Sequence, residues 1–159
     1  MKDIKDIYEQ YNVLNKLFTE TYNSIGKYEE NTLKNAASNN LSLTEYHIIE
    51  CIGLGTSEDG RTIGDIAQCM IVTLPTVTVA INKLESKGYV TKNKSTSDGR
   101  VVYIRLTRQG KKMAAAHRYF HKHMVRIVGN QFDTEELKIL IKCMGAINEM
   151  FNTMGDNDK

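Results

Sequence analysis

The sequence of 159 residues contains no tryptophan, a single proline and only three cysteines. Cys51, Cys69 and Cys143 are odd in number and form no Cys-x-x-Cys pair, so we expect reduced thiols that pack as small apolar side chains. No apolar run approaches the roughly 18 residues of a membrane span, and the first residues lack the apolar core of a signal peptide. These absences exclude a disulfide-stapled miniprotein and a membrane protein, and they predict a cytoplasmic chain.

The composition is that of a folded chain, with 41% hydrophobic and 25% charged residues. The length suits one well-cored domain. Charge, however, is distributed unevenly: residues 61–112 hold ten basic and three acidic residues, a net +7, which leaves −5 for the rest because the total is +2. A basic middle is typical of a segment that contacts phosphates, and a solvated basic face is the alternative.

The two ends of the chain predict long amphipathic helices. Apolar residues in 4–28 recur at steps of three and four, and the polar stretch 35–40 ends that helix. Thr134 is the expected N-cap of a last helix with a similar stripe, followed by a frayed tail at 155–159. Because neither stripe has another partner large enough, we expect the first and last helices to form a homodimer.

The middle of the chain predicts three shorter helices. One begins at Ser42 or Thr44 and stops at the glycines that follow, and a second covers 62–69. The third begins after the N-cap Thr73, with Pro75 in its first turn, where the missing N–H removes no helical bond. Its predicted core face is Val77, Ala80, Ile81 and Leu84, and its predicted exposed face is Pro75, Thr78, Val79, Asn82 and Ser86.

A β-hairpin is predicted next, because the strand-like segments 89–94 and 101–106 flank the turn pair Asp98-Gly99. A helix capped by Thr107 then extends to about Gly129. Helix, turn, helix and hairpin together make a winged helix, whose second helix suits the major groove of DNA. We expect a mainly α single domain, 1–159, with a winged helix-turn-helix lobe and two-stranded β wing at 42–106 and helical dimerisation regions at 1–37 and 107–155.

Motifs across this region resemble the MarR family of transcription regulators. They are Pro75-Thr76-Val77-Thr78, Leu84-Glu85-x-Lys87-Gly88-Tyr89-Val90, Asp98-x-Arg100 and Leu106-Thr107-x-x-Gly110. The resemblance covers essentially the whole chain, and it implies a non-enzymatic dimer that binds double-stranded DNA. A two-fold dimer should bind a pseudopalindromic operator with half-sites about 10 base pairs, roughly 34 to 36 Å, apart.

Within that family the chain is most similar to the FabT-type repressors of fatty acid biosynthesis. The similarity lies in Met70-x-Val72-Thr73-Leu74-x-Thr76-Val77-Thr78, Asn82-x-Leu84-Glu85-x-Lys87-Gly88-Tyr89 and His117-x-x-Phe120-His121-Lys122-x-Met124-Val125. Such repressors use acylated acyl carrier protein as corepressor, so the resemblance implies that partner or a fatty acyl ligand. The candidate effector-binding residues, with ordinary core as the alternative, are Tyr22, Ile25, Ile48, Ile49, Ile52, Met113, Phe120 and Met124.

The predicted DNA contacts combine the exposed face of the recognition helix with basic residues of the wing. They are Thr73, Pro75, Thr76, Thr78, Asn82, Lys83, Lys87, Lys94, Ser97 and Arg100. Arg100 resembles the wing-tip arginine of the family and suits a narrow minor groove. Asp98 is expected to orient Arg100, since no second acid, base or metal partner lies nearby for catalysis. Gly99 and Pro75 depart from the family pattern, so base-by-base specificity is not transferred.

Three histidines leave a second kind of effector open. His117 and His121 share a helix face at i, i+4 spacing, with His47 as a third candidate ligand for zinc. Zinc-sensing relatives in the MarR family use such a pair with a further histidine and acidic groups. The FabT-type resemblance predicts no cofactor and no metal, and a metal or small-molecule sensor is the alternative. Peroxide-sensing relatives carry a reactive cysteine early in the first helix, where this chain has none.

Overall fold

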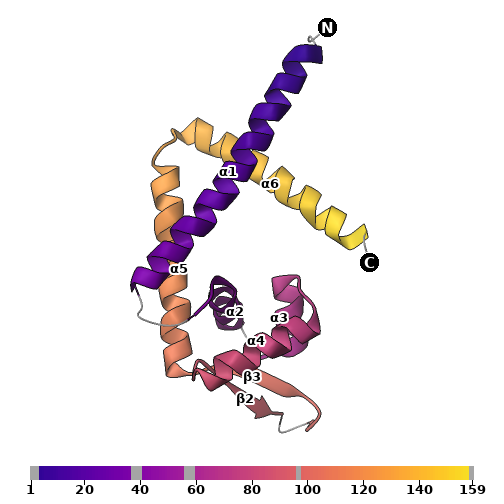
Figure 1. Ribbon diagram of the computed structural model, residues 1–159, viewed down its shortest axis with the longest axis vertical. Helices are drawn as coiled ribbons and strands as arrows, with labels where there is room; N and C mark the ends of the chain where they lie inside the picture. Colours follow the sequence, from indigo (N-terminus) through magenta and orange to yellow (C-terminus); the bar gives the residue numbers. More distant parts are fainter. Residues whose placement is uncertain (1–3, 37–40, 56–59, 96–97, 158–159) are drawn as a thin grey trace. The chain divides into compact units, whose positions relative to one another are not determined.

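The computed structural model describes residues 4–36, 41–55, 60–95 and 98–157 (Figure 1). Within these residues the elements follow in the order α1 (Ile4–Ala36), α2 (Leu43–Gly53), β1 (Arg61–Thr62), α3 (Ile63–Met70), α4 (Leu74–Ser86), β2 (Val90–Lys94), β3 (Val102–Leu106), α5 (Arg108–Gly129) and α6 (Thr134–Asn157). The fold is mainly helical, as predicted. The chain divides into two compact units, Met1–Arg118 and Tyr119–Lys159, and α2 to β3 all belong to the first.

A small antiparallel sheet has the strand order β1-β3-β2. The predicted hairpin is confirmed, with Val90 opposite Leu106 and Lys94 opposite Val102. The third strand, β1, was not predicted, because a strand of two residues is too short to show alternation. Gly60 precedes it at φ 96°, and a Cβ at Gly60 would collide with the carbonyl oxygen of Ile104. Glycine is therefore required for β1 to approach β3.

Two helices of the winged-helix lobe begin with capping boxes. Ser42 Oγ accepts from the backbone N–H of Glu45 at 3.3 Å, and Glu45 Oε2 accepts from the N–H of Ser42 at 2.7 Å. Thr62 and Asp65 exchange the same two bonds at the start of α3, at 3.1 and 2.9 Å. Each box satisfies two donors that a helix start leaves unpaired, so both helix starts are set locally.

Of two predicted N-caps, that of α4 is confirmed in position and that of α6 is wrong. Thr73 stands at the N-cap position of α4, but its hydroxyl contacts the hydroxyl of Thr76 at 2.9 Å and caps no backbone N–H. At α6 the cap is Asp133, not Thr134, because Asp133 Oδ1 accepts from the N–H groups of Glu135 and Glu136 at 2.8 and 2.9 Å. A carboxylate one residue earlier meets these two N–H groups, and it favours the positive end of the helix.

The core of the first unit confirms the predicted orientation of α4. Val77, Ile81 and Leu84 are fully buried, whereas Pro75, Thr78 and the other residues of the predicted outer face are exposed. The fully buried side chains that share this core come from α2, α3 and the sheet: Ile48, Ile49, Ile66, Val90 and Ile104. Each such side chain contributes roughly 1.5 to 3 kcal/mol by leaving water, so the apolar face holds α4 with its polar face outward.

The cysteines differ from expectation. Cys51 of α2 and Cys69 of α3 form a disulfide with their Cα atoms 6.6 Å apart, so the prediction of reduced thiols is wrong for this pair. The packing of α2 against α3 brings the two positions together, which their sequence separation of 18 does not reveal. Cys143 is free but exposed, so it does not pack as an apolar side chain in the single chain.

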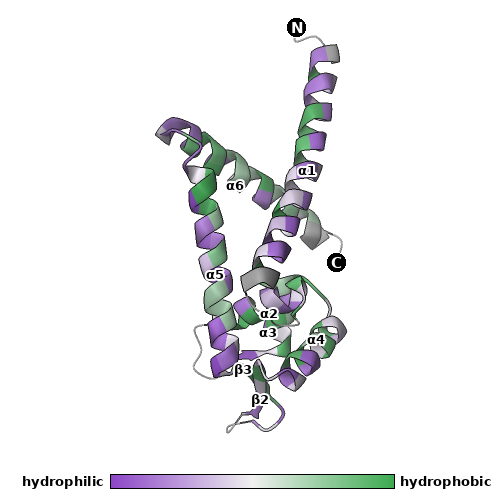
Figure 2. Ribbon diagram, turned by 60° about the vertical axis from the view of Figure 1, so that its left-hand side comes forward, coloured by the Kyte–Doolittle hydropathy of each residue, from purple (hydrophilic) through white to green (hydrophobic). Residues whose placement is uncertain are grey.

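Long apolar stripes on α1 and α6 are exposed in the single chain. Figure 2 colours the hydrophobic residues along both helices green. The exposed side chains of α1 include Tyr8, Tyr11, Leu14, Leu17 and Tyr22, and those of α6 include Ile141, Met144, Phe151 and Met154. An apolar area of this extent marks an interaction surface. Among the described residues no single helix is long and apolar enough to cross a membrane, and only α3 and α4 together, bent by 111°, meet that criterion.

Candidate nucleic-acid interface and metal centre

The outer face of α4 presents the predicted base-reading residues to solvent. Thr73, Pro75, Thr76, Thr78 and Asn82 are all exposed. The hydroxyl of Thr78 donates to the carbonyl of Leu74 at 2.9 Å, which holds the hydroxyl against the helix. These five residues are therefore accessible and small and none of them is acidic, which suits a helix that enters a major groove.

Lys92 of β2 links this face to the wing, although the sequence did not single it out. Its Nζ lies 2.6 Å from Asn82 Oδ1 and 2.6 Å from Glu85 Oε2. The carbonyl oxygen of Asn82 is thus already an acceptor, and a bidentate contact of Asn82 with adenine would first have to displace Lys92. The basic rim of the hairpin was the available signal, but it does not distinguish Lys92 from its neighbours.

Lys87 is a predicted DNA contact whose ammonium, in the free chain, contacts a carboxylate. Lys87 Nζ lies 2.8 Å from both Oε atoms of Glu45, which is buried at the start of α2. Burial raises the pKa of Glu45, but the hydrogen bonds from Lys87 and Ser42 outweigh burial and hold that pKa below its ordinary value. This ion pair joins the end of α4 to the beginning of α2.

The wing has exposed cations next to the tight turn at Asp98-Gly99. Lys94 and Arg100 are exposed, and Lys83 is exposed on α4; Ser97 lies outside the described residues. Asp98 Oδ1 accepts from the backbone N–H of Arg100 at 3.0 Å. Asp98 therefore shapes the turn that presents Arg100 through the backbone, and this is the contact by which it positions Arg100.

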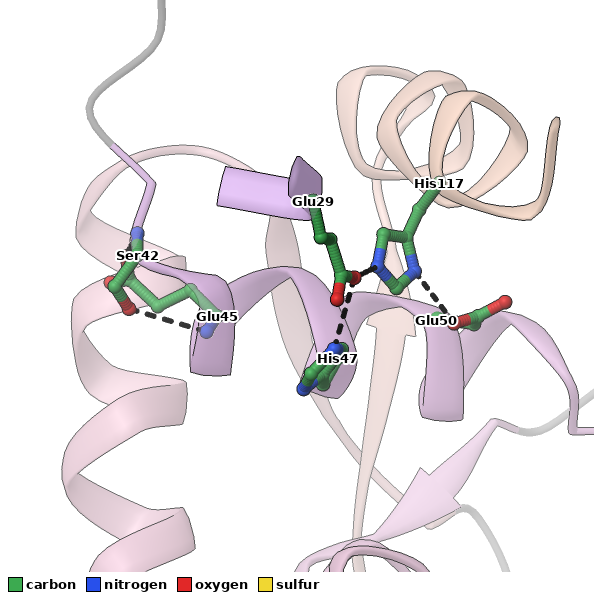
Figure 3. Close-up of polar contacts among 6 residues, drawn as sticks. All are labelled: Glu29, Ser42, Glu45, His47, Glu50 and His117. Carbon is green, nitrogen blue, oxygen red and sulfur yellow. Dashed lines mark hydrogen bonds and ion pairs between the residues drawn. The ribbon is translucent and has the colours of Figure 1, made fainter. Parts of the chain in front are cut away.

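Histidines and glutamates from three helices meet in the first unit (Figure 3). His117 of α5 is completely buried, with Nε2 2.5 Å from Glu29 Oε1 of α1 and Nδ1 2.6 Å from Glu50 Oε2 of α2. His47 Nε2 of α2 lies 3.1 Å from the same oxygen of Glu29. Glu29 is also buried, whereas 38% of the His47 side chain is exposed. The group defined by Glu29, His47, Glu50 and His117 is called the histidine cluster below.

The donor set of the histidine cluster fits a divalent metal ion. Ligand atoms of Glu29, His47 and His117 lie within 4.8 Å of one another. Tetrahedral zinc with bonds of about 2.0 to 2.1 Å separates its ligand atoms by roughly 3.3 Å, so small side-chain movements suffice. Imidazole and carboxylate are ligands that zinc prefers. His121 follows His117 by one turn of α5 and projects from the same helix face.

His117 also has the outer contact that metal-binding histidines commonly show. A neutral imidazole donates from one ring nitrogen only, yet both nitrogens of His117 face carboxylates. One nitrogen can bind a metal ion while a carboxylate lies at the other, and that carboxylate, here Glu50, is the usual orienting partner of a histidine ligand. Sequence reasoning found the histidines but missed Glu29 and Glu50, because Glu29 is 88 positions from His117 and surface glutamates are common.

The predicted effector residues fall into different environments. Ile48, Ile49 and Ile52 are buried in the core of the first unit. On α1, by contrast, Tyr22 is 80% exposed and Ile25 43% exposed. Met113 and Met124 are half-buried and Phe120 is buried. An acyl-binding role for these residues stays a prediction.

Comparison with known proteins identifies regulators of transcription. The model of the family described as "Transcriptional regulator SarA/Rot" matches residues 32–116. The uncharacterized HTH-type transcriptional regulator YhjH of Bacillus subtilis is 29% identical over 106 residues, which cover 65% of this chain and 59% of YhjH. The chain thus spans less than two thirds of that relative. Transcriptional regulator AdcR of Streptococcus pyogenes is 28% identical over 112 residues, 69% of this chain and 74% of AdcR.

A solved structure extends the similarity over nearly the whole chain. Streptococcus pneumoniae FabT in complex with DNA is 30% identical, covers 91% of this chain and 99% of its own, and superposes with a TM-score of 0.84. The comparison therefore includes a regulator of the same fold whose structure was solved in complex with DNA. These relatives and this fold are those of transcriptional regulators, which are not enzymes.

Proposed function

The chain belongs to the SarA/Rot family of transcriptional regulators and has a MarR-type winged-helix fold, and from this premise we propose that it is a homodimeric repressor whose DNA binding responds to a zinc-like metal ion. The metal response is inferred from the histidine cluster. The winged-helix lobe, residues 42–106, binds double-stranded DNA, and residues 1–37 and 107–155 form the dimer. The exposed apolar stripes of α1 and α6 support that division.

For DNA binding, α4 reads the major groove and the wing contacts the backbone and minor groove. The proposed contacts keep the ten predicted residues, with Lys87 reaching phosphate only when it leaves Glu45. A two-fold dimer then binds a pseudopalindromic operator with half-sites roughly 34 to 36 Å apart. Because contacts with phosphates release counterions, affinity for any duplex should fall steeply as salt rises.

For metal binding, Glu29, His47 and His117 would hold the ion, with His121 as a fourth ligand from the next turn of α5. Glu50 orients His117 from outside the ligand set. When bound, the ion supplies a positive charge that joins α1, α2 and α5 at one point. A metal ion alters operator binding only through a difference in its affinity for the DNA-competent and DNA-incompetent arrangements.

The Lys87–Glu45 ion pair supports a route from the metal to α4. Glu45 precedes His47 by two residues on α2, and its partner Lys87 stands at the C-cap of α4. A shift of α2 on metal binding therefore acts on the recognition helix through a buried, hydrogen-bonded carboxylate. Both ends of this route lie within the first unit.

The test begins with metal-free protein titrated with Zn²⁺ against a chromophoric chelator. We expect one ion per protomer, with affinity reduced at least 10- to 100-fold in Glu50→Gln, as for an orienting partner, and more in His47→Gln, a direct ligand. His123→Gln, on the same helix but stacked on Tyr119, is the matched control and should bind like the wild type. Stoichiometric binding that is unchanged in His47→Gln would reject the cluster.

Operator binding is measured on duplexes selected from a random library, once with Zn²⁺ and once with chelator. The proposal expects different affinity in the two conditions for wild type and His123→Gln, and equal affinity for His47→Gln. Fluorescence anisotropy at several salt concentrations gives the operator affinity with Zn²⁺ and with chelator. Failure to select any duplex in either condition would reject the DNA-binding part itself.

A second candidate effector, acylated acyl carrier protein or a fatty acyl ligand, is favoured by one observation. The FabT superposition covers 99% of that protein at 30% identity. In this alternative, acylated carrier protein tightens operator binding and unacylated carrier protein does not. A response to acylated carrier protein that persists in chelator, with none to Zn²⁺, would replace the metal by the acyl group as effector.

A further inference from the structure

The disulfide between α2 and α3 joins two cysteines that differ in exposure. Cys51 of α2 is 3% exposed, whereas Cys69 of α3 is an exposed residue. Their Cα atoms are 6.6 Å apart, within the range of roughly 4.4 to 6.8 Å that a disulfide spans. A reagent in solution therefore reaches Cys69 first, and Cys51 is the second, interior sulfur.

Apolar packing also holds α2 against α3. Ile66 of α3 is completely buried in the same core as Ile49 and Ile52 of α2. The two helices thus have a common core besides the disulfide, and a disulfide with an exposed half is open to exchange with thiols in solution. Transcription regulators act where thiols are kept reduced, and disulfides formed there are usually transient. These features favour a reversible bond over a permanent one.

Cys69 stands one residue before the end of α3, next to the turn that leads into the recognition helix α4. In that turn Ile71 has φ 53° and ψ 47°, and among the described residues it is the one non-glycine with a positive φ. This left-handed conformation is sterically unfavourable for a β-branched residue. The side chain of Ile71 is 82% exposed, so its own burial does not hold it there.

Two backbone hydrogen bonds to the last turn of α3 hold the conformation of Ile71. The N–H of Ile71 donates to the carbonyl of Gln68 at 3.3 Å. The N–H of Val72 donates to the carbonyl of Ala67 at 3.1 Å. This pattern of two bonds usually has glycine at the left-handed position. Because Cys69 lies in the same turn of α3 as the acceptors, its bond to α2 fixes the segment on which the strained turn depends.

We propose that Cys51 and Cys69 are a reversible oxidation site for hydroperoxides, and that their disulfide keeps α4 in its DNA-binding position. The second part rests on the proposed DNA binding. A strained conformation persists only where its surroundings fix it, so in the dithiol form the turn at Ile71 relaxes and α4 loses its fixed direction. The disulfide form then binds the operator more tightly, because less order has to be gained on binding.

The oxidation conserves atoms and electrons. The Cys69 thiolate attacks the terminal oxygen of the hydroperoxide, an S–O bond forms as the O–O bond breaks, and an alkoxide leaves. The Cys51 thiolate then attacks the sulfenic sulfur, the S–S bond forms as the S–O bond breaks, and hydroxide leaves. The two thiol protons end on the alkoxide and the hydroxide, which gives one alcohol and one water. Two equivalents of a small thiol reduce the disulfide again by exchange at Cys69.

The first experiment tests the oxidation site on full-length, metal-free protein with Cys143→Ser, which removes the exposed free thiol. Reduced protein is treated with one equivalent of cumene hydroperoxide, and free thiols and intact mass are measured. We expect the loss of two hydrogen atoms in mass, no remaining free thiol, and full return of both thiols with glutathione. No reaction, added oxygen atoms, a bond between two chains, or a disulfide that glutathione leaves intact would each refute the site.

The second experiment tests the connection to α4 without DNA. Amide hydrogen exchange along residues 71–86 is compared in the disulfide form, the dithiol form and Cys69→Ser, which cannot form the bond; Cys69 is exposed, so this variant should fold normally. We expect faster exchange in the dithiol form and in Cys69→Ser than in the disulfide form. Ile71→Gly should reduce the difference, because glycine adopts a positive φ without steric cost. Equal exchange in all forms, or an undiminished difference in Ile71→Gly, would overturn the role of the strained turn.

Operator affinity completes the test, with chelator present throughout so that the histidine cluster holds no metal in either form. We expect the dithiol form to bind a selected duplex about fivefold more weakly or less tightly still than the disulfide form. Cys69→Ser should bind equally with and without hydroperoxide. Equal affinity of the two forms would overturn the control of DNA binding. If no duplex binds but exchange still depends on the disulfide, the proposed DNA binding fails while the redox-controlled turn is supported.

Discussion

The ion pair between Glu45 and Lys87 predicts an unequal response to removal of its two partners. Lys87→Met leaves a carboxylate that is only 5% exposed without its counter-charge, which should destabilise the protein by about 3 kcal/mol at pH 7. Glu45→Gln leaves an ammonium on a side chain 32% exposed, which water can solvate, so we expect about 1 to 2 kcal/mol. The double variant should lose less than the two single losses combined.

The pH dependence follows from the lowered pKa of Glu45. A carboxyl whose folded pKa lies below the ordinary 4.5 adds stability above that value and loses it as pH falls through the folded pKa. In Lys87→Met, burial raises the pKa of Glu45 without the opposing hydrogen bond from Lys87, so Glu45 takes up a proton at a higher pH than in the wild type. The difference between wild type and Lys87→Met should therefore be largest near pH 7 and shrink below about pH 4.5.

Urea unfolding at fixed protomer concentration, without metal, at pH 7 and pH 4 measures these differences. Lys138→Met is the matched control, because it breaks a pair whose side chains are 65% and 78% exposed and should change stability very little. A loss for Glu45→Gln as large as that for Lys87→Met, or a Lys87→Met penalty independent of pH, would show that the pair is not coupled as the structure indicates.

Three further predictions test the remaining features. Gly60→Ala should destabilise the protein by about 2 kcal/mol or more in thermal unfolding, since φ is 96° and the Cβ meets a carbonyl of β3; a neutral result would contradict the close approach of β1. Asn82→Ala should relax the preference for one base position, at a cost of about 1 to 3 kcal/mol in binding free energy. Lys94→Ala should weaken binding to operator and scrambled duplex alike. Equal losses on both duplexes in both variants would show that the base-reading face of α4 is wrongly assigned. Reduction of the Cys51–Cys69 disulfide should lower the free energy of unfolding by about 2 to 4 kcal/mol, and a Cys51→Ala variant that is insensitive to reductant is the comparison.

The order and type of the main elements could be predicted because they depend on local patterns. The steps of three and four in α1, the Pro75 start of α4 and the turn pair Asp98-Gly99 each act within a few residues. Which face of α4 is buried also followed from periodicity alone. Details decided by a single hydrogen bond, such as Asp133 as the cap of α6, lay beyond that reasoning, because neighbouring residues of similar chemistry compete for the same role.

Pairings between distant positions were decided only by the tertiary structure. Glu29 joins His117 across 88 positions, and Cys51 meets Cys69 only because α2 packs against α3. Lys87 carries the same charge whether it faces DNA or Glu45, and only burial of Glu45 determines which partner it takes in the free protein. The sequence by itself thus determined a basic winged-helix lobe between amphipathic helices, since periodicity and charge are properties of a segment. The chemistry of the histidine cluster was decided by packing, because ligands and counter-charges depend on distances in space that the sequence spacing does not give.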